Sequence, residues 1–340
     1  MKQPAFPDSI QLGHGSGGLM TRELLDQIVF STFSNPFLDR KHDGSVLPID
    51  GPLAISTDSF VVSPIFFKGG DIGDLAVNGT VNDVAMCGAR PEYLSLSFIL
   101  EEGLPTADFI RIAQSVRRAA ETAGVQIVTG DTKVVERGKG DKIFINTTGI
   151  GKVHPRANIA LSNVRPGDRL LLSGPLAAHG MAILSEREGL QFESEIRSDT
   201  ACLNHMVLEL LDHFGSDVHL LRDPTRGGLA SVCSEIAQDS RLGIELWETA
   251  LPLDAQVAAA CEILGMDPLY VANEGVCCAL VAPEIETAAL EIMRRHAAGN
   301  RAVCVGSVRE THPGKVIMQS SVGGSRIVTP LLGEQLPRIC

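Results

Sequence analysis

The chain has 340 residues, of which 44% are hydrophobic and 21% charged, so it can form well-packed cores and is long enough for two domains. Its net charge of −12, with only 1 Trp and 2 Tyr, argues against nucleic acid, which needs cationic surfaces and aromatic stacking platforms. The sequence shows neither a signal peptide nor an apolar run of membrane-spanning length. We therefore expect a cytoplasmic protein with no nucleic-acid and no membrane partner.

The elements follow one another in chain order without strict alternation of strands and helices. Periodicity predicts a glycine-rich segment and a helix within residues 1–40, and then strands and helices up to residue 155. A polar turn with Pro166 and Gly167 precedes a new series of strands and helices. This order favours an α+β fold over a doubly wound parallel sheet. We expect an N-terminal domain at 41–155, a C-terminal α+β domain at 160–310, and strands with a tail at 311–340.

The first polar cluster is LGHGSGG at residues 12–18, which predicts a loop whose backbone N–H groups can approach phosphates. Gly13, Gly15 and Gly18 also match G-x-G-x-x-G, and Asp39 follows 21 residues later. A dinucleotide-binding fold is therefore an alternative. It is disfavoured because only SIQL precedes the motif and no parallel strand follows at the expected distance. A flexible N-terminal linker is a further alternative.

The second cluster lies on the helix predicted to begin at Asp71. Asp74, Asn78 and Asn82 are spaced four residues apart and so share one face, and Asp83 lies beside them. A solvated face is the alternative, but such faces usually carry Lys and Glu. Short Asp and Asn side chains instead favour a ligand that approaches the backbone.

The third cluster is GDTK at residues 130–133, which we expect at the end of a strand, where ligands often bind. Asp131 could bind a metal and Lys133 could contact a phosphate or act as a base, although a plain turn is equally compatible.

The fourth cluster is DPTRGG, in which Gly227 and Gly228 open a helix after Asp223. Helix starts attract anions, and a well-capped turn is the alternative.

The 8 cysteines include no C-x-x-C pair, which makes a zinc ribbon or a thioredoxin-type site improbable. Cys277, Cys278 and Cys304 lie in apolar runs, where cysteine usually fills core space. Cys340 ends the chain in the sequence PRIC. Taken alone, this position leaves open whether Cys340 is functional.

These clusters in this order resemble the PurM-like ATP-binding family of aminoimidazole ribonucleotide synthetase, selenophosphate synthetase and thiamine-monophosphate kinase. Within it, GHGSGG, VNDVAMCGA, GDTKVV, DPTRGGLA, NEG and the terminal PRIC look like the HypE family of hydrogenase maturation carbamoyl dehydratases. The resemblance runs almost end to end. It implies a two-domain α+β fold that forms a homodimer through its N-terminal sheets, with ATP near the shared face and a flexible C-terminal tail.

The resemblance also implies ligands for the nucleotide and its metal. Mg²⁺ would be held by aspartates, which map to Asp43, Asp58, Asp83, Asp131 and Asp223. The loop from Gly13 to Gly18 would close over the nucleotide. Together with the other polar clusters, this gives as candidate ATP-binding residues Gly13, His14, Gly15, Ser16, Gly17, Gly18, Asn78, Asn82, Gly130, Thr132, Gly227 and Gly228.

The implied reaction begins when the partner HypF places a carbamoyl group on the sulfur of Cys340. ATP-dependent dehydration then leaves a thiocyanate, and the cyano group passes to iron held by the HypC–HypD complex for the NiFe hydrogenase. Lys133, Glu274 and Asp83 are the other candidate catalytic residues, with structural ion pairs as the alternative for Lys133 and Glu274. Competing functions are a small-molecule phosphotransferase or synthetase of the same fold and a non-enzymatic metal scaffold.

Overall fold

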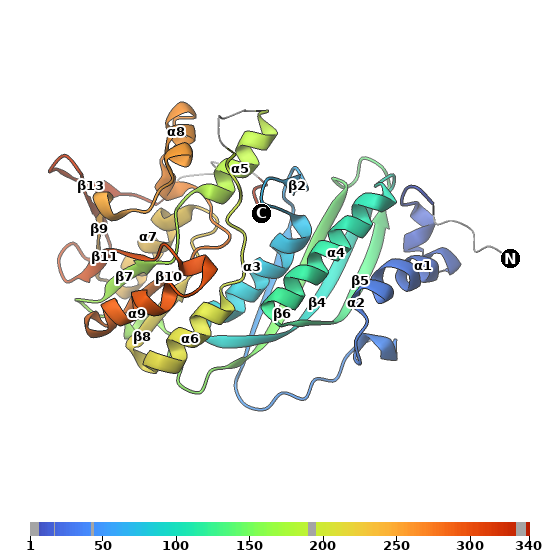
Figure 1. Ribbon diagram of the computed structural model, residues 1–340, viewed down its shortest axis with the longest axis horizontal. Coiled ribbons are helices and arrows are strands. Elements are labelled where there is room, and N and C mark those ends of the chain that lie inside the picture. Colours follow the sequence, from blue (N-terminus) through green and yellow to red (C-terminus); the bar gives the residue numbers. More distant parts are fainter. Residues whose placement is uncertain (1–6, 17, 42–43, 190–194, 331–337) are drawn as a thin grey trace.

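The computed structural model describes residues 7–16, 18–41, 44–189, 195–330 and 338–340. Two mixed sheets lie side by side, each with helices packed on it (Figure 1). The strand orders are β1-β6-β4-β5 in the first sheet and β13-β12-β9-β11-β7-β10-β8 in the second. Neighbouring strands are antiparallel except for the pairs β4–β5 and β12–β9. The predicted α+β fold is confirmed.

The strands of the first sheet and of the small β2–β3 ribbon are β1 Leu53–Phe60, β2 Phe66–Phe67, β3 Gly70–Asp71, β4 Ala89–Glu101, β5 Gln126–Val135 and β6 Ile143–Val153. Those of the second sheet are β7 Arg169–Leu172, β8 Val218–Arg222, β9 Gly243–Trp247, β10 Cys278–Val281, β11 Val303–Arg309, β12 Val316–Gln319 and β13 Ser325–Val328. The helices are α1 Leu19–Leu24, α2 Ser31–Phe33, α3 Ile72–Met86, α4 Thr106–Ala123, α5 Ala178–Arg187, α6 Asn204–Phe214, α7 Gly228–Ser240, α8 Ala255–Ile263 and α9 Glu286–Met293.

Helix α3 occupies the middle of the molecule, between the first sheet and elements of the second half (Figure 1). Asp71 caps it by accepting hydrogen bonds from the N–H groups of Gly73 and Asp74, which satisfies donors that the first turn leaves free. Nearly all its residues are buried. The predicted helix is confirmed, but the face with Asn78 and Asn82 packs against the second half of the chain and is not solvated.

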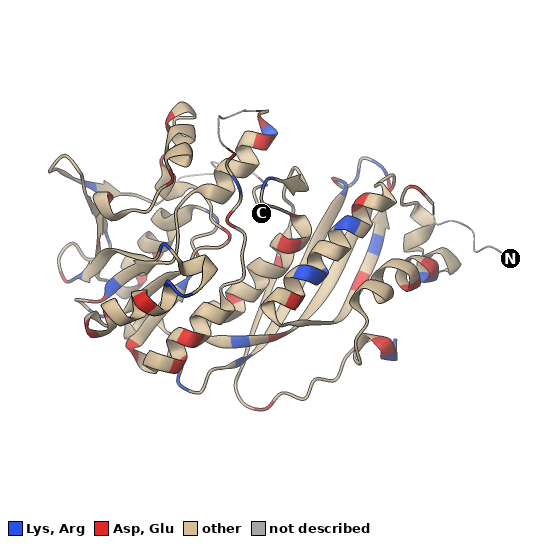
Figure 2. Cartoon of the chain, viewed as in Figure 1, with Lys and Arg blue, Asp and Glu red and all other residues tan. Residues whose placement is uncertain are grey.

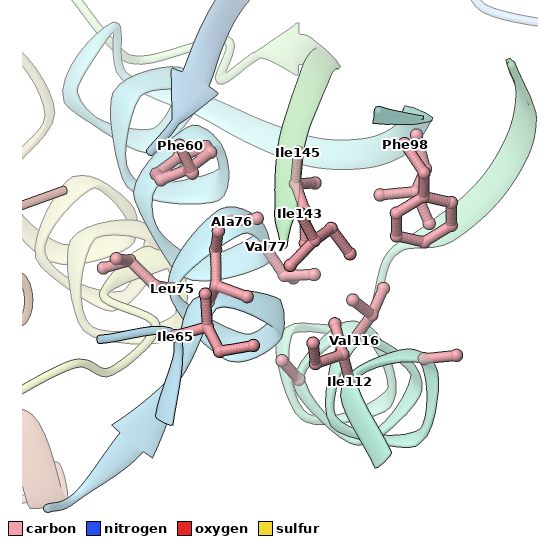
Figure 3. Packing of buried hydrophobic residues seen from close by; sticks show 14 of the residues in the cluster. Phe60, Ile65, Leu75, Ala76, Val77, Phe98, Ile112, Val116, Ile143 and Ile145 are labelled. Atoms are coloured by element: carbon pink, nitrogen blue, oxygen red, sulfur yellow. The ribbon is translucent and has the colours of Figure 1, made fainter. Parts of the chain in front are cut away.

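The main core of the first half lies between the first sheet and helices α3 and α4 (Figure 3). Strand β6 alternates buried and half-buried residues, so Ile143 and Ile145 point toward Val77, Ile112 and the rest of the helix layer. Each fully buried side chain of this size contributes about 1.5–3 kcal/mol. This layer fixes α3, and with it the polar residues that α3 carries.

One local prediction was wrong. GDTK is neither the end of a strand nor a turn, because it lies inside β5. Helix α4 begins after its N-cap Pro105, and the Thr106 hydroxyl donates to the Pro7 carbonyl. The helix ends at Gly124, with φ +74°, a conformation that glycine adopts without strain.

Candidate functional site

The last three residues of the chain dock between the two halves, close to β2, α3 and α5 (Figure 1). The backbone N–H groups of Val61 and Ser63 donate to the main-chain oxygens of Cys340 and Arg338, at 3.1 and 3.3 Å. The Arg338 side chain donates back to the Val61 carbonyl at 3.1 Å and pairs with Asp141. These contacts hold the end of the chain like an added strand, so Cys340 has a defined place in the structure.

The Cys340 side chain is buried, with 9% of its surface exposed. Its Sγ accepts a hydrogen bond from the Arg226 guanidinium at 3.5 Å. Burial, followed by the nearby charge of Glu274, raises the pKa of this thiol to about 12, and Arg226 only partly opposes the rise. A free thiol in this position is therefore a weak nucleophile.

Acidic side chains from both halves gather around the docked tail. Asp58 lies on β1, Asp83 on α3 and Asp223 directly after β8. The Asp83 carboxylate accepts from the Ser56 hydroxyl at 2.7 Å. Burial, followed by the charge of Asp83, raises the pKa of Asp223 to about 7, and burial is also the main cause of the raised pKa of Asp58 and of Asp83. Three of the five predicted metal ligands thus lie near one another.

Glu274 is the most deeply buried acid of this group. Its Oε1 has no hydrogen-bond partner within the described residues, and its backbone N–H donates to Asp199 at 3.1 Å. Burial raises the pKa of Glu274 well above its usual value, and the charges of Asp199 and Asp223 raise it further. A buried carboxyl with an open acceptor position next to the cysteine is suited to proton transfer.

The donors around Asp58, Asp83 and Asp223 are the hard oxygens that Mg²⁺ prefers. In the described part of the chain, no three His, Cys, Asp or Glu side chains are arranged to hold a metal ion by themselves. Mg²⁺ is usually bound by one or two carboxylates, with water and phosphate oxygens completing its shell. The residues therefore fit a magnesium ion shared with a nucleotide better than a cage built from protein ligands alone. Asp43 lies outside the described residues.

Asp131 and Lys133 lie elsewhere. They are on β5, and β1 and β5 are the two edges of the four-stranded sheet, so about 14 Å of sheet separates Asp58 from Asp131. The Lys133 ammonium pairs with the Asp131 carboxylate at 2.7 Å and lowers its pKa. Ser97 and Ile99 are their register partners on β4, and Ile99 is exposed. This places both side chains on the face of the sheet opposite the helices.

The glycine-rich segment packs beside β5 and is not a flexible linker where the structure describes it. Residues Leu12–Gly15 form a 3-10 turn. His14 is buried there, and its Nδ1 accepts from the Gln11 backbone N–H. A Cβ on Gly15 would lie 2.6 Å from the Val134 nitrogen, so glycine permits this close approach. No strand leads directly into the turn, and the dinucleotide-fold alternative is wrong.

The remaining residues of this segment have local roles. Ser16 donates to the Gly13 carbonyl at 2.9 Å, and Gly18 is the N-cap of α1. Gly17 lies outside the described residues. A cavity of about 270 Å³ is bordered by Gly15, Gly130, Asp131, Thr132 and Lys133, among others. The glycine-rich segment and the GDTK part of β5 therefore border the same cavity, which lies apart from Cys340.

Asn78 and Asn82 connect the two halves of the chain. The Asn82 side chain donates to the Ala201 carbonyl at 3.0 Å and accepts from the Leu203 N–H at 2.8 Å, while Asn78 donates to the Thr200 hydroxyl at 3.2 Å. These bonds give both residues a structural role, and nucleotide binding by them stays a prediction. Asn78 also borders a cavity of about 710 Å³ between α4 and α6. Asp74 of the same predicted face lines this cavity, and the residues predicted to bind metal or to take part in catalysis do not.

Gly227 and Gly228 begin α7 with positive φ values of 78° and 61°. A Cβ on Gly228 would lie 2.5 Å from the Leu269 carbonyl oxygen. This pair therefore makes the sharp turn that follows Asp223 and precedes the helix. Arg226, just before the pair, was missed as a site residue although it lies within the DPTRGG motif. Its charge in that motif was the signal that could have identified it.

His179, Ser198 and Asp199 were also missed, and no motif singles them out. All three approach the docked tail or Glu274 through hydrogen bonds between distant parts of the chain.

Figure 2 shows the charge distribution: α3 carries acidic residues without Lys or Arg, while α4 carries several arginines.

The chain was compared with known proteins. Residues 41–153 match the N-terminal domain of AIR synthase related proteins, and residues 165–319 match their C-terminal domain. Carbamoyl dehydratase HypE of Bradyrhizobium diazoefficiens is 51% identical over 332 residues, which is 97% of this chain and 96% of that protein. The chain belongs to the HypE family of carbamoyl dehydratases. The predicted resemblance is confirmed.

Solved structures of HypE proteins agree with this assignment. Hydrogenase maturation protein HypE in complex with ATP is 48% identical and superposes with a TM-score of 0.94, covering 97% of this chain and 99% of that one. The chain solved in a HypE–HypF complex is 44% identical, with a TM-score of 0.80, covering 92% of this chain and 100% of that one. Among the helices described for this HypE-family chain, none is both long and apolar enough to cross a membrane.

Proposed function

We propose that this chain dehydrates an S-carbamoyl group on Cys340 to a thiocyanate while ATP is converted to ADP and phosphate, and so supplies the cyanide ligand of the NiFe hydrogenase iron. The observation that carries the proposal is the place of Cys340. The sulfur of the terminal residue lies beside Arg226 and Glu274, in a buried acidic site that draws residues from both halves. A phosphotransferase acting on a small molecule has no use for this arrangement.

Bound ATP with Mg²⁺ would supply the phosphoryl group that turns the carbamoyl oxygen into a phosphate leaving group. The ATP complex of a HypE protein 48% identical to this chain supports assigning ATP here. Asp58, Asp83 and Asp223 are the residues we assign to Mg²⁺. Their raised pKa values reflect burial first. Repulsion adds to it, by Asp58 for Asp83 and by Asp83 and Asp58 for Asp223, which a cation would relieve.

The carbamoyl nitrogen must lose both of its protons as the oxygen leaves. Glu274 is placed to accept one, because its Oε1 is buried without a partner among the described residues and burial makes it more basic than an exposed carboxylate by raising its pKa, and the other proton would leave with the phosphate. Arg226 is placed to hold the sulfur end of the group through the hydrogen bond that now reaches Sγ. Burial of the site would keep water from hydrolysing the activated group.

Lys133 and Asp131 would join this chemistry through a homodimer. Both lie on the outer face of the first sheet, where Leu53, Ile55 and Ile99 are exposed. Exposed apolar residues grouped on one sheet face are typical of an interaction surface. A second copy of the chain packed on this face would cover them and enclose Lys133, the glycine-rich segment and a nucleotide between the chains.

The carbamoyl group must be loaded when Cys340 is away from this site. The pKa of about 12 and the burial of the docked thiol make it a poor nucleophile there. The structure of a HypE–HypF complex supports HypF as the loading partner, and HypC–HypD would receive the cyano group afterwards. We place these steps in the cytoplasm.

The test uses the purified chain with HypF and its carbamoyl donor. On addition of ATP, we expect intact mass spectrometry to show the loss of one water from the carbamoylated protein. Cys340→Ala should abolish carbamoyl-dependent ATP turnover, and Cys87→Ala, at an exposed cysteine, should leave it unchanged. Undiminished turnover in Cys340→Ala would overturn the proposal in favour of a small-molecule phosphotransferase. Binding of metal without any binding of ATP would favour a scaffold.

A further inference from the structure

One buried histidine connects the docked tail to the interior of the second half. His179 lies on α5 and is 0% exposed. Its Nε2 lies 2.7 Å from the main-chain oxygen of Ile339, and its Nδ1 lies 2.8 Å from the Ser198 hydroxyl oxygen. The ring also packs edge-on against Phe67, with centroids 5.6 Å apart. No step of the proposed dehydration uses this imidazole.

The hydrogen bonds define the protonation of the ring. The Ile339 carbonyl can only accept, so Nε2 carries the proton and donates it. Burial lowers the pKa of His179 to about 4, so the ring is neutral at neutral pH and Nδ1 accepts from the Ser198 hydroxyl. The Ser198 oxygen in turn accepts from the Thr200 backbone N–H at 3.1 Å. Every polar group in this chain of bonds has the partner it needs.

We propose that His179 is a positioning residue that fixes the register of the docked tail, with Ser198 setting the orientation of its ring. The inference rests on the proposed function for its catalytic meaning, since Cys340 must be the carrier of the reacting group. Ile339 and Cys340 are adjacent, so holding the carbonyl of the first fixes where the sulfur of the second can lie. A shift of about 1 Å at a reacting group is enough to lower a rate strongly.

The same short segment also sets the position of Glu274. Asp199 follows Ser198 and accepts from the Glu274 backbone N–H at 3.1 Å. Ser198 therefore positions the tail through His179, and Asp199 positions the candidate base Glu274. Both contacts start from the same piece of backbone. This shared support keeps the carried group and the base at a constant separation.

The experiment measures how accessible Cys340 is in the full-length chain. Alkylation with iodoacetamide is followed by digestion at glutamate, which releases the C-terminal peptide ending in PRIC for mass spectrometry. His179→Phe keeps the buried ring and removes both hydrogen bonds. We expect Cys340 to be alkylated about tenfold faster, because the docked state loses one hydrogen bond and leaves a buried carbonyl unpaired. Ser198→Ala should give a smaller increase of about two- to fivefold.

Two controls separate positioning from general loosening. The alkylation rate of the exposed Cys87, measured in the same samples, should not change. His205→Phe, at an exposed histidine on α6, should leave the rate at Cys340 unchanged. If His179→Phe does not fold, Ser198→Ala carries the test. An unchanged Cys340 rate in a folded variant would overturn the inference.

A second readout connects the inference to catalysis. With the tail carbamoylated and ATP saturating, His179→Phe should lower the single-turnover rate of dehydration about tenfold and leave the Kd for ATP unchanged. A purely structural role would lower stability and ATP affinity together. If the wild-type chain shows no dehydration while His179→Phe still exposes Cys340, the proposed function fails and the positioning of the tail stands.

Discussion

The Cys340 site and the Asp131–Lys133 region differ in how complete each is within a single chain. Around Cys340, side chains and backbone from both halves converge, and burial raises the pKa values of Glu274 and Asp223. Asp131 and Lys133 instead pair with each other on an exposed strand face. Buried charges without full compensation are costly and usually serve chemistry, whereas a solvated ion pair contributes little. The fold of a single chain assembles the first region, whereas the role proposed for the second region depends on the proposed homodimer.

Glu274→Gln should lower the dehydration rate at the Cys340 site more than any other substitution described below. Gln has the same shape but cannot accept a proton, so we expect the dehydration rate to fall by about 10²–10⁴-fold while ATP still binds. Replacing a buried carboxyl should not lower the melting temperature, because Gln avoids the cost of burying a charge. Single-turnover mass spectrometry and thermal unfolding measure the two effects.

The matched control is Glu262→Gln, at an exposed position on α8, which should behave like the wild type. A rate within about threefold of the wild type in Glu274→Gln would exclude general-base catalysis by this residue.

The second region should be sensitive to changes in the outer sheet face. Ile55 is 64% exposed on β1, and Ile55→Asp would bury a charge in the proposed dimer interface. We expect light scattering to show a monomer at concentrations where the wild type is a dimer, with dehydration reduced about tenfold or more. Ile263→Asp, at a residue 70% exposed on α8, should change neither property. A fully active dimer in Ile55→Asp would mean that the exposed face has another use.

The sequence predicts the fold class and α3 because their signals are local: strand and helix periodicity, and the predicted start of a helix at Asp71. The resemblance also groups Asp58, Asp83 and Asp223 with Asp43 and Asp131 as metal ligands. The first three do lie near one another, whereas Asp131 lies on the opposite edge strand of the sheet. The sequence misplaces GDTK because a strand with polar residues on one exposed face looks like a strand end followed by a turn. Local sequence does not show which strand face is exposed.

His179, Ser198 and Asp199 could not have been found from the sequence for a different reason. Each is defined by a hydrogen bond to a residue far along the chain, such as the bond of His179 to Ile339. Nothing in AHGMAIL or RSDTA marks these partners. The docking of the tail could not be predicted for the same reason, since its neighbours Val61 and Ser63 are about 280 residues away in sequence. The sequence does single out Cys340 as the expected carrier, which stays a prediction, but the docked position of this residue depends on long-range packing.

The smallest expected effect is on stability, and it tests Asp223 in the Cys340 site. The pKa of Asp223 is about 7 in the folded chain and near 4 when unfolded, so the folded state binds its proton more tightly. The stability this contributes is fully present below about pH 4 and is lost as pH rises through about 7. Asp223 is half-buried, so solvent screening limits the change in melting temperature to a few degrees.

Asp223→Asn should therefore reduce the fall in melting temperature between about pH 5 and pH 8, and at the upper end the variant should be more stable than the wild type. Asp239→Asn, at an exposed position on α7, is the control and should keep the wild-type slope. Added Mg²⁺ with ATP should stabilise the wild type most at high pH, where Asp223 is ionised and repels Asp83. A pH slope unaffected by Asp223→Asn would mean that this carboxylate is already compensated in the folded chain. The contrast between the two regions would then rest on Glu274 alone.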